Sequence, residues 1–359
     1  MAGMPTEPVA SLPPTLIYGA GAVGCLLGGV LAAGGALVTL LGRPAVAEAV
    51  ACQGLTVVQS SGTRRIHLPV VTSIDALPAR PSLVLLTVKA YAVAAALPDL
   101  RRLAAAGAAI VALQNGVGTE ETLLAEPDMP RLASGTLTAS VVWDSPATVR
   151  QETAGGVTLA PVRGDVPLDQ FAAALTAAGL PAGVVPRYQD LKWSKLLLNI
   201  MANATAALLA LPPAAIYADP RLFAVERAAF IEAFAVMLGA GIRPIPLPGF
   251  NVPLLAHAMR LPAPLARRLI AARAARGRGE KRPSLWLDVD RGMGTTEVRW
   301  LNGAVADLGA RLGVPTPVNA ALTALLEEVA RNPERRRAFA GRPDALLAAL
   351  GQTSGIAQA

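Results

Sequence analysis

The sequence is poor in the residues that carry much of protein redox and metal chemistry. Of 359 residues, two are cysteines (Cys25 and Cys52) and two are histidines (His67 and His257). Two cysteines cannot form a disulfide framework, which favours a reducing compartment, and we expect a cytoplasmic protein. Two histidines exclude a histidine-rich metal site and most histidine-based catalysis, so we expect no bound metal.

Charged residues are also scarce, whereas hydrophobic residues are abundant. Charged residues make up 16% of the chain and hydrophobic residues 53%, against about 25% charged residues in ordinary soluble chains. A chain of this composition buries too much apolar surface to be disordered. At about 150 residues per domain, its length predicts two domains. The net charge of +7 favours an anionic partner.

Two long segments, 8–42 and 196–218, contain no charged residue. Either is long enough to cross a bilayer, which takes about 20 apolar residues. The first, however, is interrupted by glycines and opens as a short strand, and the second is broken by Pro212 and Pro213. No basic region precedes the first segment, so it does not resemble a secretory signal. We therefore expect no membrane association.

The first half of the chain alternates short β-rich runs with helical stretches. Continuous apolar runs such as 83–88 (LVLLTV) and 109–113 (AIVAL) are typical of buried parallel strands. This alternation predicts a Rossmann-type, doubly wound α/β domain with a parallel sheet. The strands that we expect are 16–18, 36–41, 83–88, 109–113, 136–142 and 157–161.

After Pro186 the periodic stretches are helical, which predicts a C-terminal all-helical domain. The helices that we expect there are 191–209, 220–238, 252–276, 284–312 and 320–328. We also expect the glycine- and arginine-rich loop 276–283 to be mobile. The domain organisation that follows is a flexible extension over 1–13, a Rossmann domain over 14–186, a helical domain over 187–350 and a flexible tail over 351–359.

The first strand leads into a glycine pattern typical of dinucleotide-binding proteins. Residues 16–24 read LIYGAGAVG, a G-x-G-x-x-G pattern that opens a helix running to Ala33. The first glycine permits a tight turn, the second lets the backbone approach a pyrophosphate, and the third lets the helix pack against the strand. The alternative is a glycine-rich helix contact without a ligand. The residues that we expect to bind the dinucleotide are Gly19, Ala20, Gly21, Ala22, Val23 and Gly24.

The residue after the second strand distinguishes two nicotinamide cofactors. NAD sites place an Asp or Glu there to accept from the ribose 2′-hydroxyl. Here Arg43 occupies that position, and the first acid, Glu48, falls inside the next helix. A guanidinium pairs bidentately with a 2′-phosphate. The sequence therefore predicts NADP (NADPH), with the alternative that Arg43 only ends a solvated strand.

Two polar groups follow the central strands, beyond whose carboxyl ends doubly wound sheets bind ligands. Lys89 directly follows 83–88 and can pair with a cofactor phosphate or ribose, or can be an ordinary solvated lysine. Asn115 follows 109–113 and precedes Gly116. It can orient the nicotinamide or the substrate, or can make an Asx-type turn.

One helical stretch carries the sharpest polar pattern in the chain. Lys195, Asn199 and Asn203 are spaced four residues apart among apolar neighbours, so we expect them on one face of a helix. Buried amides need partners, and a buried lysine is costly unless an anion or a proton transfer compensates. Because desolvation lowers the pKa of a lysine, Lys195 is the candidate general acid. The alternative is a core helix whose amides cap neighbouring backbone.

In order and spacing these residues resemble the ketopantoate reductase (2-dehydropantoate 2-reductase) family over about 16–328. The resemblance implies a Rossmann domain joined to a helical domain for substrate binding and dimerisation, with the site in the cleft between them. It implies NADPH-dependent reduction of ketopantoate to pantoate, in the pathway to pantothenate and coenzyme A. The resemblance rests on GAGAVG, the LTVKA stretch with Lys89, Gln114-Asn115-Gly116, the Lys-Asn-Asn helix and Thr296-Glu297 ahead of Leu301-Asn302-Gly303.

The resemblance also implies roles for single residues. Lys195 would be the general acid at the substrate carbonyl, and Glu297 would take part in catalysis and in cofactor binding, although its plain alternative is to stabilise the start of a helix. Asn199 and Asn203 would orient the substrate. Ser284 would hold the substrate carboxylate, and Asn115 would line the junction of nicotinamide and substrate.

The chain departs from the family pattern on the substrate side. The usual Ser-Met-Leu-Gln-Asp reads SLWLD at 284–288, and the stretch that leads to Glu297 is one residue longer. A further asparagine often found after the Lys-Asn-Asn helix is replaced near Pro212-Pro213.

Three other functions fit parts of the sequence. The chain can be a paralogous NADP-dependent oxidoreductase that acts on another 2-oxo acid or an imine, or an NADPH-binding sensor without turnover. The arginine-rich segment 260–282 can bind nucleic acid, but it lacks the interleaved aromatics that stack on bases, so we expect no nucleic-acid partner. The partner that we expect is a small-molecule 2-oxo acid, and the sequence leaves a homodimer open.

Overall fold

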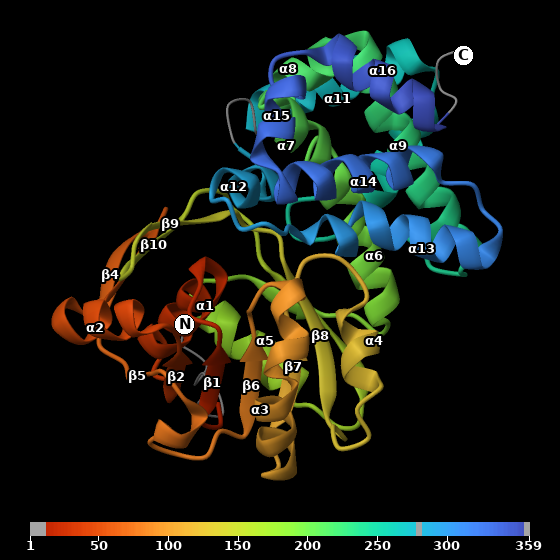
Figure 1. The fold of residues 1–359 in the computed structure, drawn as a ribbon. Coiled ribbons are helices and arrows are strands. Elements are labelled where there is room, and N and C mark those ends of the chain that lie inside the picture. The colour runs from red at the N-terminus through yellow and green to blue at the C-terminus, as the bar shows by residue number, and fades with distance from the viewer. Residues whose placement is uncertain (1–11, 278–281, 355–359) are drawn as a thin grey trace, which may run out of the picture. The chain divides into compact units, whose positions relative to one another are not determined.

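The computed structural model describes residues 12–277 and 282–354 (Figure 1). The segments 1–13, 276–283 and 351–359, for which we expected a flexible extension, a mobile loop and a flexible tail, lie partly outside these ranges. Of their described residues, 276–277 belong to the helix Ala263–Gly277, and 351–354 belong to the helix Pro343–Ser354. No helix in the described ranges is long and apolar enough to cross a bilayer. The chain divides into two compact units: the first comprises residues up to Gln114, Thr119–Leu191 and Leu247–Gly249, and the second comprises Asn115–Gly118, Lys192–Pro246 and the residues from Phe250 onward.

The first unit is built on an eight-stranded sheet (Figure 1). Its strands, in spatial order, are β12 (Ala182–Val184), β11 (Val157–Arg163), β8 (Leu132–Leu137), β7 (Ala109–Ala112), β6 (Leu83–Leu86), β1 (Thr15–Tyr18), β2 (Val38–Leu41) and β5 (Val70–Val71). From β8 to β5 every pair is parallel, whereas β11 is antiparallel to β8. The strand order reverses at β1, and such a switch point is where doubly wound sheets bind ligands.

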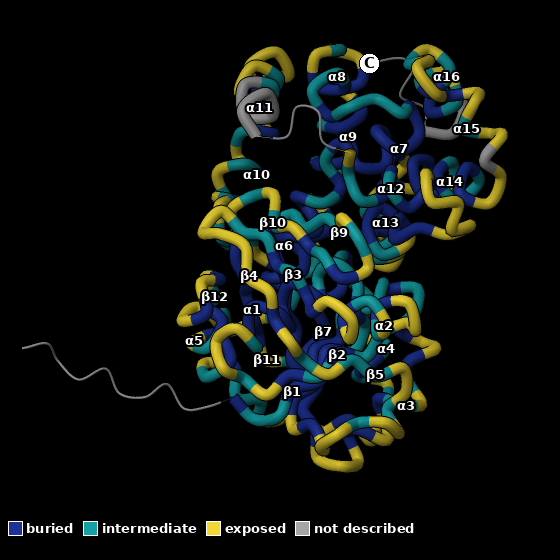
Figure 2. The backbone as a smooth tube through the Cα atoms, turned by 90° about the vertical axis from the view of Figure 1, so that its left-hand side faces the viewer, coloured by how far each residue is buried: buried dark blue, intermediate teal, exposed yellow. Residues whose placement is uncertain are grey.

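The central strands are buried on both faces (Figure 2). In β1, Leu16 belongs to one hydrophobic cluster and Ile17 to the other, and β6 and β7 alternate in the same way. Helices α1 (Ala22–Ala33) and α5 (Leu168–Ala177) contribute to the cluster of Ile17, and α3 (Val93–Ala105) contributes to the cluster of Leu16. Two-sided burial is why these strands appear in the sequence as continuous apolar runs.

A second sheet, which we did not expect from the sequence, also packs on α1. Its strands, in order, are β4 (Gly62–Ile66), β3 (Leu55–Gln59), β10 (Thr148–Gln151) and β9 (Val141–Ser145). Both sheets approach α1 closely because it carries glycines: a Cβ on Gly28 would lie 2.5 Å from Leu40 Cδ2, and one on Gly29 would lie 2.5 Å from Val57 Cγ2. Burial between two sheets explains why this part of the uncharged segment 8–42 is apolar.

The strand expected over 136–142 is wrong, because the chain changes sheets within it. β8 ends at Leu137 and β9 begins at Val141. Between them, the Thr138 hydroxyl accepts from the Gly156 amide at 3.0 Å. The chain leaves the large sheet at this point and enters the small one. The remaining short elements of the first unit are α2 (Pro44–Gln53), η1 (Ile74–Ala76), η2 (Ala90–Ala92) and α4 (Thr119–Leu124).

All the secondary-structure elements that the structure describes in the second unit are helices, joined by loops (Figure 1). The fold class predicted from the sequence, a Rossmann-type parallel sheet followed by a helical region, is therefore confirmed. The helices are α6 (Tyr188–Ile200), in which the boundary between the units falls, α7 (Ala204–Leu209), α8 (Pro213–Ala218), α9 (Pro220–Gly239), α10 (Val252–Arg260), α11 (Ala263–Gly277), α12 (Ser284–Asp290), η3 (Glu297–Trp300), α13 (Asn302–Leu312), α14 (Pro317–Arg331), α15 (Pro333–Phe339) and α16 (Pro343–Ser354).

Three helices expected in this region are each divided. The helix expected over 191–209 is interrupted at Ala202, which has φ +48°. The helix over 252–276 is interrupted before Pro262, because a residue that precedes proline is disfavoured in the helical region. The helix over 284–312 is interrupted where Gly292 and Gly294 take positive φ values of 62° and 67°.

Candidate active site

Three glycines shape the turn between β1 and α1. Gly19 has φ +116°, and a Cβ there would lie 2.8 Å from the backbone nitrogen of Val88. A Cβ on Gly24 would lie 2.2 Å from the carbonyl oxygen of Gly19, whereas a Cβ on Gly21 would meet no atom within 4 Å. Two of the positions thus allow close packing, and the third faces open space. This is the arrangement that lets a G-x-G-x-x-G backbone approach a phosphate.

The first turn of α1 has features that suit an anion. Its N-cap is Gly21, which offers no capping side chain, and the turn contains no acidic residue. The amides of Ala22, Val23 and Gly24 have no intrahelical acceptor because they are the first three of the helix. Such amides, together with the positive end of the helix dipole, favour a bound phosphate.

Thr87 holds this turn in place, although it was not singled out from the sequence. It directly follows β6, and its hydroxyl donates to the carbonyl oxygen of Gly19 at 2.7 Å. On the next strand, the Gln114 amide donates to the carbonyl oxygens of Leu86 at 2.7 Å and Val88 at 3.1 Å. These bonds tie the carboxyl ends of β1, β6 and β7 together. The position of Thr87 at the end of a buried strand was the available signal.

Two cations follow strands of the large sheet. Arg43 is exposed just after β2 and is the N-cap residue of α2. Its side chain makes no hydrogen bond or ion pair with any residue in 12–277 and 282–354, so its guanidinium can bind an anion. Lys89 is half-buried, three residues beyond the end of β6, and is the N-cap residue of η2.

Asn115 lies in a loop that is held on η3 within the second unit. The Val117 amide donates to the carbonyl oxygen of Trp300 at 2.9 Å. Gly116 has φ +83°, and a Cβ on it would lie 2.2 Å from the same oxygen. With the loop fixed in this way, Asn115 Oδ1 accepts from Asn199 Nδ2 at 3.1 Å. Both side chains are half-buried and retain donors for a further ligand.

The expectation that Lys195, Asn199 and Asn203 share one face of one helix is wrong for Asn203. Helix α6 ends at Ile200, and Asn203 is the N-cap residue of α7. Lys195 and Asn199 remain one turn apart on α6, so their side chains are neighbours. Asn203 is linked to them differently, because its Nδ2 donates to the main-chain oxygen of Asn199 at 2.9 Å.

Asn203 also contacts the start of α12. Its Nδ2 lies 3.3 Å from Ser284 Oγ, and its Oδ1 accepts from the Leu285 amide at 3.1 Å. Four of the residues singled out from the sequence therefore form one hydrogen-bonded series. We call it the amide row, and its members are Asn115, Asn199, Asn203 and Ser284.

Two buried charged residues of the second unit were also singled out. Lys195 is 8% exposed and Glu297 is 1% exposed. Glu297 begins η3, where the hydroxyl of Thr296 accepts from the Val298 amide at 3.3 Å. Lys192 was not singled out, although it is 2% exposed and lies three residues before Lys195 on the same side of α6.

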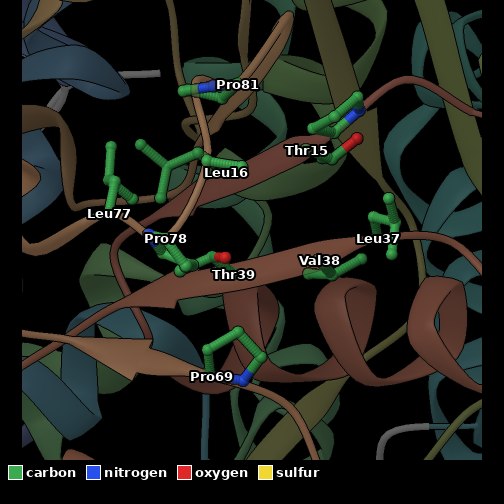
Figure 3. Close-up of a pocket in the computed structure, with 11 residues that line it drawn as sticks. Thr15, Leu16, Leu37, Val38, Thr39, Pro69, Leu77, Pro78 and Pro81 are labelled. Carbon is green, nitrogen blue, oxygen red and sulfur yellow. The ribbon is translucent and has the colours of Figure 1, made fainter.

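A cavity of about 250 Å³ in the first unit is not part of this candidate site (Figure 3). It opens at the amino ends of β1 and β2, where Thr15 and Val38 line it, whereas Gly19 and Arg43 follow the carboxyl ends of the same strands. Its other lining residues are mainly prolines and aliphatic side chains, and none is charged.

Part of the arginine-rich segment is engaged within the second unit. The Arg260 guanidinium lies 6.0 Å from the centre of the Phe234 ring, and Arg267 donates to the carbonyl oxygen of Ala218 at 3.2 Å. The side chains over 272–281 lie outside the described residues. The contacts of Arg260 and Arg267 are those of surface helices packed on their neighbours.

Family profiles match both parts of the chain. "Ketopantoate reductase PanE/ApbA" matches residues 15–164, and "Ketopantoate reductase PanE/ApbA C terminal" matches residues 187–330. The 2-dehydropantoate 2-reductase of Halobacterium salinarum is 30% identical over 320 residues, which cover 88% of this chain and 99% of that protein. The 2-dehydropantoate 2-reductase of Pyrococcus horikoshii is 27% identical over 314 residues, which cover 87% and 95%.

Solved structures agree with these matches. The PanE/ApbA family ketopantoate reductase of Ralstonia eutropha superposes with a TM-score of 0.75 at 27% identity, covering 90% of this chain and 99% of that chain. The 2-dehydropantoate 2-reductase of Geobacter metallireducens gives a TM-score of 0.75 at 26% identity, covering 88% and 99%. D-mandelate dehydrogenase with NADH and anilino(oxo)acetate gives a TM-score of 0.74 at 21% identity over 89% of this chain and 99% of that chain, which shows a shared fold. The chain therefore belongs to the ketopantoate reductase family and is an oxidoreductase.

Proposed function

We propose that this protein uses NADPH to reduce a 2-oxo acid, with ketopantoate as the substrate and pantoate as the product, on the route to pantothenate and coenzyme A. The observation that carries the proposal is the amide row, which lies one helical turn from the buried Lys195. A 2-oxo acid presents a carboxylate and a ketone oxygen, and its product presents a hydroxyl. Amide and hydroxyl groups can hold all three. The shared family with 2-dehydropantoate 2-reductases supports this substrate.

A nicotinamide cofactor fits the groups of the first unit. The open side of Gly21 and the amide end of α1 suit a pyrophosphate. The structure of D-mandelate dehydrogenase contains NADH, which supports a nicotinamide cofactor in this fold. The exposed guanidinium of Arg43 supports the 2′-phosphorylated form, because it can pair bidentately with that phosphate. Lys89 would contact a cofactor phosphate or ribose, and the bound nicotinamide would supply the hydride.

The residues of the second unit would bind the substrate and supply the proton that its reduction consumes. Lys195 Nζ donates a proton to the ketone oxygen as that oxygen gains negative charge, and the ammonium also stabilises this charge. Asn199 and Asn203 orient the substrate, and the Ser284 hydroxyl donates to its carboxylate. These four residues thus hold the two ends of a 2-oxo acid.

Two further residues complete the proposed site. Asn115 would line the junction between nicotinamide and substrate, using the amide donors that its bond to Asn199 leaves over. Glu297 would take part in catalysis and in cofactor binding. Its burial at the start of η3 is unusual for a carboxylate and consistent with a functional role.

The test is the loss of NADPH absorbance when purified protein is mixed with ketopantoate, pyruvate or 2-oxoisovalerate, with NADH as a parallel cofactor. We expect fast turnover with ketopantoate and NADPH and slow turnover with the other two acids. Faster turnover with another acid would identify a paralogous reductase. Tight NADPH binding without turnover of any acid would reject the proposal in favour of a sensor.

A further inference from the structure

A buried glutamate of the second unit takes no part in the chemistry described above. Glu226 lies in α9 and is 3% exposed. Its Oε2 accepts from the Ala202 amide, and its Oε1 accepts from the Thr205 hydroxyl. It makes no ion pair with any residue of the described chain, and its neighbour Arg227 donates instead to the carbonyl oxygen of Leu261 at 3.0 Å. A buried carboxylate without a countercharge is costly, so the buried position of Glu226 needs an explanation, and its two hydrogen bonds indicate one.

Both donors belong to the break between α6 and α7. Ala202 has φ +48°, a left-handed conformation that residues with a Cβ rarely adopt. In an uninterrupted helix the Ala202 amide would donate to the carbonyl oxygen of Leu198, four residues earlier. Here it donates to Glu226. The carboxylate therefore takes the place of the helical acceptor and stabilises the break.

The break determines where Asn203 lies. In a continuous helix the carbonyl oxygen of Asn199 would accept from the main-chain amide of Asn203. Here it accepts from the side-chain Nδ2 of Asn203. The same side chain then bonds Ser284 Oγ and the Leu285 amide. Closing the break would disrupt this arrangement and separate the two halves of the amide row.

We propose that Glu226 is a positioning residue of the 2-oxo acid site: by holding the α6–α7 break it places Asn203 and Ser284 for the substrate. This inference rests on the proposed function, because it takes the amide row as the substrate-binding surface. Glu226 acts through Ala202 and Thr205 and touches neither substrate nor cofactor.

Glu232 provides a matched control on the same helix. It also accepts from backbone amides, those of Val318 at 2.9 Å and Asn319 at 3.0 Å. These amides belong to α14 and not to the break. Its removal should therefore destabilise the fold while leaving the amide row in place. The pair separates a loss of stability from a loss of positioning.

The experiment compares steady-state kinetics of the full chain and its variants with ketopantoate and NADPH. Glu226→Ala is expected to raise the KM for ketopantoate about tenfold, as expected for loss of about one substrate hydrogen bond, with the KM for NADPH unchanged. In Glu226→Gln the KM for ketopantoate should stay close to the wild-type value, because the side-chain oxygen of glutamine still accepts from the Ala202 amide and its NH₂ group can donate to the Thr205 hydroxyl. Glu232→Ala should lower the Tm without raising this KM. An unchanged KM in Glu226→Ala, or an equal rise in Glu232→Ala, would overturn the proposal.

Two further variants test the conformation of the break itself. Ala202→Gly in the Glu226→Ala background should reverse part of the rise in KM, because glycine adopts positive φ values readily. Thr205→Val removes one of the two donors at nearly constant volume and should raise the KM about threefold, a fraction of one hydrogen bond. If Glu226→Ala does not fold, Thr205→Val tests the positioning role in its place. An unchanged KM in Thr205→Val would count against the proposal.

Hydrogen exchange over residues 199–205 provides a readout that needs no substrate. Exchange in this segment should be faster in Glu226→Ala than in the wild-type protein or in Glu232→Ala. Unchanged exchange in Glu226→Ala would reject the positioning role. Absence of wild-type turnover with any of the three oxo acids would instead reject the proposed function, so the two failures are distinguishable.

Discussion

The two units build their candidate binding groups in different ways. In the first unit the proposed nucleotide groups lie within 19–24, at Arg43 and at Lys89, each one to three residues beyond the carboxyl end of a strand or in the helix that follows it, and backbone geometry sets most of their arrangement. In the second unit the amide row joins side chains from segments that are far apart in the sequence. A site formed by backbone is damaged by added atoms, whereas a site formed by side chains is damaged by removed atoms. Substitutions of both kinds can therefore test the comparison.

The largest effect is expected from truncation in the second unit. Lys195→Ala removes the proposed proton donor, and we expect kcat to fall about 10³-fold, or about 4 kcal/mol in activation free energy. The affinity for NADPH, measured by fluorescence titration, should stay nearly constant because Lys195 is not among the groups proposed to bind the cofactor. Arg331→Ala, which removes an exposed cation of α14, is the control. Unchanged turnover in Lys195→Ala would contradict its assignment.

Added methyl groups should have two distinct effects in the first unit. In Gly24→Ala the new Cβ would lie 2.2 Å from the carbonyl oxygen of Gly19, so the fold should lose about 3 kcal/mol of unfolding free energy. In Gly21→Ala the Cβ meets no protein atom within 4 Å, so urea unfolding should be unchanged while NADPH binding weakens. If Gly21→Ala bound NADPH as tightly as the wild-type protein, its open side would not be the pyrophosphate site.

The same comparison explains what the sequence could and could not reveal. The glycine turn was predictable because its geometry depends on residues a few positions apart, and the burial of both Leu16 and Ile17, in clusters on opposite faces of the sheet, follows from two-sided packing. The break at Ala202 was not predictable, because neither glycine nor proline occurs over 196–209. Its cause is Glu226, 24 residues further along the chain.

The small sheet and the loop before η3 show the same distinction. β3 and β10 pair in parallel although about 90 residues of chain separate them, a pairing that no local pattern specifies. In contrast, the interruption after α12 had a local signal in Gly292 and Gly294, which take positive φ values. One helix was nevertheless expected over 284–312, so this local signal was overlooked, whereas the pairing of β3 with β10 had no local signal to read.

Glu226 also predicts a pH dependence of stability in the second unit. Burial raises its pKa to about 7, from an ordinary value near 4.5. The folded chain therefore binds a proton that the unfolded chain has released between about pH 5 and pH 7. This contribution is full below the unfolded pKa and is lost as the pH rises through 7, by about 2 kcal/mol between pH 5 and pH 8.

Urea unfolding at these two pH values measures the effect. The loss of unfolding free energy between pH 5 and pH 8 should be larger in the wild-type protein than in Glu226→Gln, which cannot titrate. Equal losses in the two proteins would show that the carboxyl group titrates outside this range. A substitution at exposed Glu334, which pairs with Arg337 on the surface, should leave the difference intact.

The smallest effect tests a group of the first unit that depends on its side chain. Arg43→Ala should weaken NADPH binding about tenfold, or about 1.4 kcal/mol, because a charge-assisted pair with the 2′-phosphate is lost. NADH binding should hardly change, since NADH has no phosphate at that position. Arg43→Lys keeps the charge but not the bidentate geometry, so it should fall between the two. Equal weakening of NADPH and NADH binding would mean that Arg43 attracts the pyrophosphate through its charge. The choice of cofactor in the first unit would then depend on backbone geometry and not on Arg43.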